Sequence, residues 1–140
     1  PAKAYMRKAA EDSACTWSIQ NGKVEVLENS GYLPGQAVDL NYASGLVGSP
    51  EQTDRGIKAR CLINPRLRIG GRIRLNNKSI VRARQDIFMG DLALPSLDRD
   101  GFYRVLQQEI SGDTRGNDWY MDNVCIGLDD TSHLPLDMVN

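Results

Sequence analysis

Hydrophobic and polar residues alternate along most of this chain with the period of short β-strands, and only its start has helical spacing. Residues 2–14 place alanine and methionine on one side and charged residues on the other, which is typical of an amphipathic helix. Residues 16–19 and 23–26 alternate around Asn21-Gly22, a pair that tolerates positive φ at both turn positions. We therefore predict a helix followed by a β-hairpin with a type I′ turn.

The rest of the chain predicts further strands and the connections between them. Residues 37–40 predict a short strand, whereas residues 42–56 are rich in glycine, serine and proline and predict a connection. Residues 57–63 and 73–75 both alternate, which predicts a second hairpin or two neighbouring strands with a long connection. The remaining expectations are strands over 101–110 and 119–128, a loop over 85–100, a turn-rich connector over 111–118 and a mobile tail after residue 129.

Together these elements predict an α+β fold that is mainly β. A short N-terminal helix and β-hairpin (1–44) should precede a compact antiparallel β-barrel-like domain (45–128) and a C-terminal tail (129–140). With 140 residues the chain is long enough to bury a core. No apolar run approaches the roughly 20 residues that a membrane helix needs, so we expect no membrane partner.

The distribution of charge adds a feature that the net charge of −1 conceals. Residues 55–84 hold ten lysines and arginines and no acidic residue, while acidic residues are in excess on both sides of this segment. Several of the basic residues alternate with apolar positions. One strand face is therefore expected to carry Arg60, Arg72 and Arg74 while the other face is buried.

Two interpretations of this basic segment remain open. Its charges could neutralise phosphates on a small barrel of the oligonucleotide-binding kind. Such a face normally interleaves aromatic residues, however, and residues 55–84 contain no Phe, Trp or Tyr. Alternatively, the basic strands pair with an acidic surface on another subunit, or line a channel. For the function of the chain as a whole, a small-molecule-binding or sugar-binding β domain is a further possibility.

The sequence offers no catalytic or metal-binding constellation. The three cysteines lie far apart with no CxxC spacing, and we expect them to be reduced, buried residues. The single histidine, His133, lies in the tail, so we predict no enzyme activity, no metal and no cofactor. Asp113 and Arg115 are expected to shape a turn in which the aspartate satisfies its own backbone. Trp17 and Trp119 are expected in the core or at a domain interface, Trp119 in the core with the next residue on the opposite face.

Four stretches resemble a known family when they are taken in order. They are GLVGSPEQTDRGI (45–57), CLINPRLRIG (61–70), GFYRV (101–105) and SGDTRGNDWY (111–120). Their order and spacing resemble the C-terminal region of baseplate hub, or tail-tip, proteins of tailed bacteriophages and prophages, of the T-even hub or late-control type. The helix and hairpin before them resemble the segment that precedes these motifs in that family.

The resemblance implies structural work and no catalytic residue. It implies β domains related to the tail tube and hub fold, and a ring, commonly a trimer, that joins the tail tube to the central spike of the virion. The partners would be other tail and baseplate proteins, made in the cytoplasm of the bacterial host. Family members are longer than this chain, which agrees with a C-terminal fragment that starts at Pro1 rather than at a methionine.

Combined with the charge pattern, the resemblance suggests where the basic residues lie. A strongly positive channel would retain DNA at low salt, so we expect them at a subunit interface, against acidic segments such as 85–100 or 122–130. The interface candidates are Arg60, Arg66, Arg68, Arg72, Arg74, Arg82 and Arg84. The structural candidates are Trp17, Gly22, Asp113, Arg115 and Trp119. The alternative function is a nucleic-acid-binding small β-barrel, OB-like, that uses residues 55–84.

Overall fold

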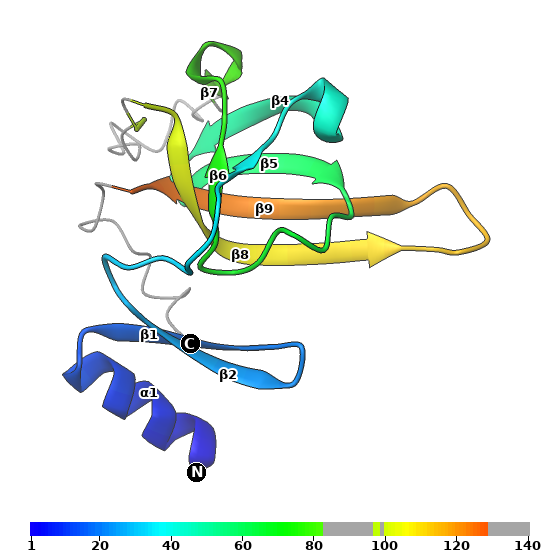
Figure 1. Cartoon of the computed structure of the whole chain (residues 1–140). Helices are drawn as coiled ribbons and strands as arrows, with labels where there is room; N and C mark the ends of the chain where they lie inside the picture. The colour runs from blue at the N-terminus through cyan, green and yellow to red at the C-terminus, as the bar shows by residue number, and fades with distance from the viewer. Residues whose placement is uncertain (83–96, 99, 129–140) are drawn as a thin grey trace, which may run out of the picture.

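The computed structural model describes residues 1–82, 97–98 and 100–128, and this part is mainly β with a single α-helix at the N-terminal end (Figure 1). Most of the loop expected over 85–100, and the tail expected after residue 129, lie outside the described residues. The described elements are α1 (Ala2–Asp12), β1 (Cys15–Gln20), β2 (Lys23–Glu28), β3 (Val38–Asp39), the 3-10 helix η1 (Tyr42–Ser44), β4 (Leu46–Thr53), β5 (Gly56–Leu62), β6 (Arg72–Arg74), the 3-10 helix η2 (Asn77–Ser79), β7 (Val81–Arg82), β8 (Phe102–Gly112) and β9 (Trp119–Gly127).

The predicted N-terminal helix and hairpin are confirmed. β1 and β2 form a two-stranded antiparallel sheet of their own, and α1 packs against β1. Asn21 and Gly22 have φ values of 51° and 75°, the positive angles that a type I′ turn requires. Trp17 lies on β1 and is only 8% exposed, as expected for a core or interface residue.

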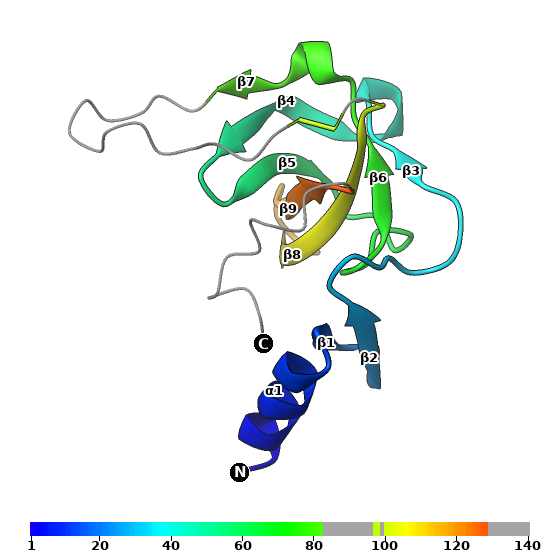
Figure 2. The ribbon, with the colours of Figure 1, turned by 90° about the vertical axis from the view of Figure 1, so that its left-hand side faces the viewer.

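The other seven strands form one sheet in the order β3-β6-β8-β9-β5-β4-β7. Neighbours run antiparallel except at the two ends, where the short strands β3 and β7 pair in parallel with β6 and β4. The sheet curls about its core, as Figure 2 shows from the side. Among the described strands its order ends at β3 and β7, so it is an open half-barrel. The predicted α+β, mainly β, barrel-like class is confirmed.

The hydrophobic core lies on the concave face of this sheet. Ile57, Ala59 and Cys61 of β5 point into it, as their alternation predicts, and Tyr103 of β8 and Cys125 of β9 meet them there. All three cysteines of the chain are free thiols. Burial raises the pKa of the thiols of Cys61 and Cys125, which keeps both protonated. Cys15 is only partly buried, so the expectation that all three lie in the core is wrong for this one.

Two expectations about connectivity are wrong. Residues 42–56 are not merely a connection, because they contain η1 and the strand β4. The pairing of β4 with β5 shifts register between Val47 and Glu51, so that Gly48, Ser49 and Pro50 form an irregularity within the strand. Because these three residues interrupt the alternation, the sequence pattern does not predict β4. Strands β5 and β6 are not hairpin partners or neighbours either, because β8 and β9 lie between them. Alternation identifies the buried face of a strand, not the strand beside it.

Candidate interaction surface

Arg60 is held by the sheet that carries it. It lies on the convex face of β5, directly opposite Asp122 on β9. Its Nε and one terminal nitrogen donate to the two carboxylate oxygens of Asp122 at 2.8 and 3.0 Å, a bidentate pair. The hydrogen bond from Arg60 lowers the pKa of Asp122, and the same contact raises the pKa of Arg60. Arg60 is therefore engaged within its own chain, with an acidic residue from the segment expected to face another subunit.

Arg68 connects the large sheet to the N-terminal hairpin. One of its terminal nitrogens lies 2.5 Å from a carboxylate oxygen of Glu25 on β2. Beside it, the side-chain amide of Gln20 donates to the Ile69 carbonyl (2.9 Å) and accepts from the Ile69 N–H (3.0 Å). Gly70 has a φ of 84°, which favours glycine, and an added Cβ would lie 2.3 Å from Leu27 Cδ1, so a side chain here would also displace Leu27 of the hairpin. The basic loop after β5 therefore serves as the docking platform of the hairpin.

Arg72 and Arg104 hold the linker between the hairpin and the sheet. They lie opposite each other on β6 and β8. Arg72 donates to the Gly35 carbonyl and has its guanidinium 4.3 Å from the ring centre of Tyr32. Arg104 donates to the Gly31 carbonyl at 2.6 Å. Burial lowers the pKa of Arg104, which is only 6% exposed. Arg104 was not among the predicted residues, since it lies outside the basic segment and alternation alone would expose it.

The remaining basic candidates are more open to solvent or lie at the limit of the described chain. Arg66 is exposed in the loop after β5. Arg74 is exposed on β6, with its guanidinium 5.6 Å from the ring centre of Phe102. Arg82 pairs through its backbone with Gln52, while Arg84 lies outside the described residues. Arg60, Arg72 and Arg74 do point away from the core, as predicted, but β8 and β9 separate Arg60 from the other two.

The turn between β8 and β9 behaves as predicted. Asp113 accepts from the Arg115 N–H through its side chain at 2.9 Å, and its own N–H donates to the Asp118 carbonyl at 2.8 Å. The N–H of Gly116 donates to the Asp113 carbonyl at 3.3 Å. The aspartate thus closes its own turn, the local role that such residues often have in turns.

Trp119 is not buried, so the prediction for its environment is wrong, although the prediction for its face is right. Together with Met121 and Asn123 it points to the concave side, and Tyr120 points to the convex side. Met121 and Asn123 are buried, whereas Trp119 is 47% exposed. The reason is position: Trp119 begins β9 at the far end of the β8–β9 ribbon, beyond the residues that cover the core (Figure 1).

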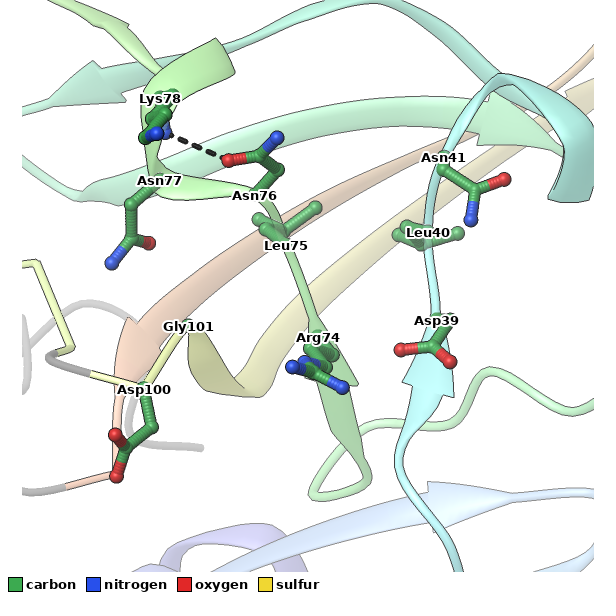
Figure 3. A pocket seen from close by; sticks show the side chains of 10 residues that line it. All are labelled: Asp39, Leu40, Asn41, Arg74, Leu75, Asn76, Asn77, Lys78, Asp100 and Gly101. Atoms are coloured by element: carbon green, nitrogen blue, oxygen red, sulfur yellow. Dashed lines mark hydrogen bonds between the residues drawn. The ribbon is translucent and has the colours of Figure 1, made fainter.

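A hollow of about 510 Å³ opens near the β3 edge of the sheet (Figure 3). Arg74 and Lys78 contribute positive charge to its lining, and Asp39 and Asp100 contribute negative charge. Asn77 is used by the fold, because it accepts from the Tyr103 hydroxyl and donates to a backbone carbonyl, both at 2.6 Å. Balanced charges of both signs suit the side chains of a protein partner better than a phosphate group.

Searches for related proteins give no family for the chain: no protein-family model matches it, and no curated protein matches its sequence. Within residues 1–82, 97–98 and 100–128, no group of three or more His, Cys, Asp or Glu side chains is placed to hold a metal ion. None of the helices in this part of the chain is long and apolar enough to cross a membrane.

Proposed function

We propose that this chain is a structural subunit of a phage tail, part of a baseplate hub or tail tip that joins the tail tube to the central spike. It works through contacts with other tail proteins and with further copies of itself in a ring, commonly a trimer. It needs no cofactor and performs no catalysis. It is made in the cytoplasm of the bacterial host and ends in the virion.

One observation carries this proposal. The motif stretches that resemble hub proteins are far apart in the sequence, and their apolar residues meet in a single core. Leu46 and Ile57 come from the first stretch, Leu67 from the second, and Tyr103 and Val105 from the third. In this chain the motifs therefore supply core positions rather than the lining of a ligand site, which supports a structural role.

The arginines support a role in assembly in two ways. Arg68, Arg72 and Arg104 already join two parts of one chain by contacting a carboxylate and two backbone carbonyls. Arg66 and Arg74 are exposed and free to face a neighbour. Charged side chains at such positions set register and partner choice more than they add affinity.

A nucleic-acid-binding OB-like barrel remains the second candidate, and one observation favours it. Although residues 55–84 contain no aromatic residue, other segments place aromatic rings beside three of their arginines. The pairs are Arg60 with Tyr120 (5.5 Å), Arg72 with Tyr32 (4.3 Å) and Arg74 with Phe102 (5.6 Å). Rings next to guanidinium groups are the usual elements of a single-strand binding face.

The double substitution Arg66→Glu with Arg74→Glu separates these functions, and Lys3→Glu with Lys8→Glu on α1 is its control with the same change of charge. All four residues are exposed, so neither variant should lose stability. We expect the first variant to fail to enter tail particles when it is produced with the neighbouring tail proteins, and the defect should shrink as salt rises. Normal assembly combined with lost binding of single-stranded DNA would contradict the hub function and favour the alternative.

A further inference from the structure

The β8–β9 ribbon extends beyond the strand that covers its outer side. β6 pairs with β8 only from Phe102 to Arg104. One residue further along β8, the Gly70 N–H donates to the Val105 carbonyl at 2.8 Å, and the Val105 N–H donates to the Gly71 carbonyl at 3.0 Å. This side of β8 is therefore bonded as far as Val105. Residues 107–112 pair with β9 on one side, and no described strand pairs with them on the other. Among the described residues, this half of β8 is therefore an open sheet edge.

The direction of the backbone groups at this edge follows from the ladder. The Asp113 N–H donates to the Asp118 carbonyl, so this pair is hydrogen-bonded. Bonded and non-bonded pairs alternate in an antiparallel ladder. Counting back along the observed register, Gln108, Ile110 and Gly112 direct their N–H and C=O groups away from β9. The N–H and C=O groups of these three alternate residues thus face the open side, where an added strand can form hydrogen bonds with them.

The side chains at the edge define what such a strand must carry. On the concave side Ile110 is 58% exposed, and Trp119, opposite Gly112, is 47% exposed. These two residues continue the core face past the point where it is covered. On the convex side Glu109 is exposed, and the acidic residues Asp113 and Asp118 follow at the turn. A matching strand therefore alternates apolar residues toward the concave side with basic residues toward the convex side.

We propose that the open edge of β8, residues 107–112, is a strand-acceptor site. It binds an extended segment of a partner protein that alternates apolar and basic residues. Main-chain hydrogen bonds to Gln108, Ile110 and Gly112 give affinity, while contact with Ile110 and Trp119 and the charge of Glu109 give selectivity. This edge is separate from the arginines on which the proposed function rests. The strand-acceptor proposal therefore does not depend on the chain being part of a tail assembly.

The acetylated and amidated peptide KVKVKVK is a suitable probe, with EVEVEVE as the control for charge. Amide hydrogen exchange followed by NMR should show that KVKVKVK slows exchange at Gln108, Ile110 and Gly112. The amides of Gln107, Glu109 and Ser111 already point to β9 and should change little. A KVKVKVK peptide with N-methylated valines should lose at least tenfold in affinity, because it cannot complete the ladder. EVEVEVE keeps the main-chain bonds but carries the opposite charge, so it should bind more weakly than KVKVKVK.

The substitution Ile110→Pro removes an N–H that faces the open side and leaves the ladder to β9 intact. We expect it to weaken binding of KVKVKVK at least tenfold, while Ile110→Val keeps binding close to wild type. Equal affinity for the plain and N-methylated peptides, or protection outside residues 108–112, would overturn the proposal. So would self-association of the chain that Ile110→Pro abolishes, because a second copy would then occupy the edge.

Discussion

Arg72 and Arg104 lie directly opposite each other on β6 and β8, and each donates a hydrogen bond to a carbonyl of the same linker. Two like charges at opposed positions normally destabilise a sheet. Here the carbonyls of Gly35 and Gly31 accept from them, and the ring of Tyr32 covers Arg72. The linker thus compensates the repulsion, and the two arginines fix where the N-terminal hairpin leaves the sheet.

The first prediction concerns Arg104. Replacing it with Met keeps much of the side-chain volume but leaves the Gly31 carbonyl without its donor. Loss of one partner of a buried hydrogen bond costs about 1–3 kcal/mol, and we expect the free energy of unfolding in urea to fall by that amount. Arg74→Met on the neighbouring strand is the matched control, because Arg74 is exposed and its loss should change stability little. Equal effects of the two substitutions would contradict a structural role for Arg104.

Features that depend on residues close together in the sequence could be predicted, whereas features that depend on residues far apart in the sequence could not. The Asn21-Gly22 turn and the buried face of β5 depend on local backbone preference and side-chain period, and both were predicted. The separation of β5 from β6 depends on which distant strands fill the space between them, and alternation carries no such information. For Trp119 the face was predictable, but its exposure depends on where the covering elements end. The role of Arg104 depends on a linker more than 70 residues earlier in the chain.

The second prediction concerns Gly22. A Cβ at this position would meet no atom within 4 Å, so only its φ of 75° opposes a side chain. Gly22→Val should therefore destabilise the hairpin by roughly 1–3 kcal/mol through backbone strain alone. Gly22→Asn should cost less, since asparagine tolerates the left-handed region. Amide exchange in β1 and β2 measures the effect, and similar protection in both variants would contradict it.

The third prediction corrects the expectation for Trp119. A fully buried tryptophan would cost roughly 3–5 kcal/mol on truncation to alanine. Because Trp119 is about half exposed, we expect Trp119→Ala to cost at most about half as much. Trp17→Ala, which empties a buried site, should reduce the free energy of unfolding more. Urea unfolding of both variants provides the comparison, and a larger loss for Trp119→Ala would show that the end of the ribbon is covered.

The fourth prediction concerns stability at high pH. Burial raises the pKa of Tyr103 to about 12. A tyrosine with a raised pKa in the folded state contributes stability that is complete below its unfolded pKa, near 10, and is lost as the pH rises toward 12. This two-unit difference corresponds to a loss of roughly 2–3 kcal/mol. Tyr103→Phe should be less stable at neutral pH, because it loses the hydrogen bond to Asn77, but should lose less on going to high pH. Parallel curves for the two proteins would contradict the assignment.

The last prediction tests the contact between Arg68 and Glu25, which joins the hairpin to the large sheet. Both side chains are partly open to solvent, so the pair is worth about 1 kcal/mol or less. Arg68→Glu should release the hairpin through repulsion between two carboxylates and raise amide exchange in β2. Adding Glu25→Arg restores opposite charges across the same gap, so the double variant should recover part of the protection. Because a partly exposed pair is screened, the loss in Arg68→Glu should also decrease with salt. If the double variant is as unprotected as Arg68→Glu alone, the bonds of Gln20 to the Ile69 backbone hold the hairpin, not the ion pair.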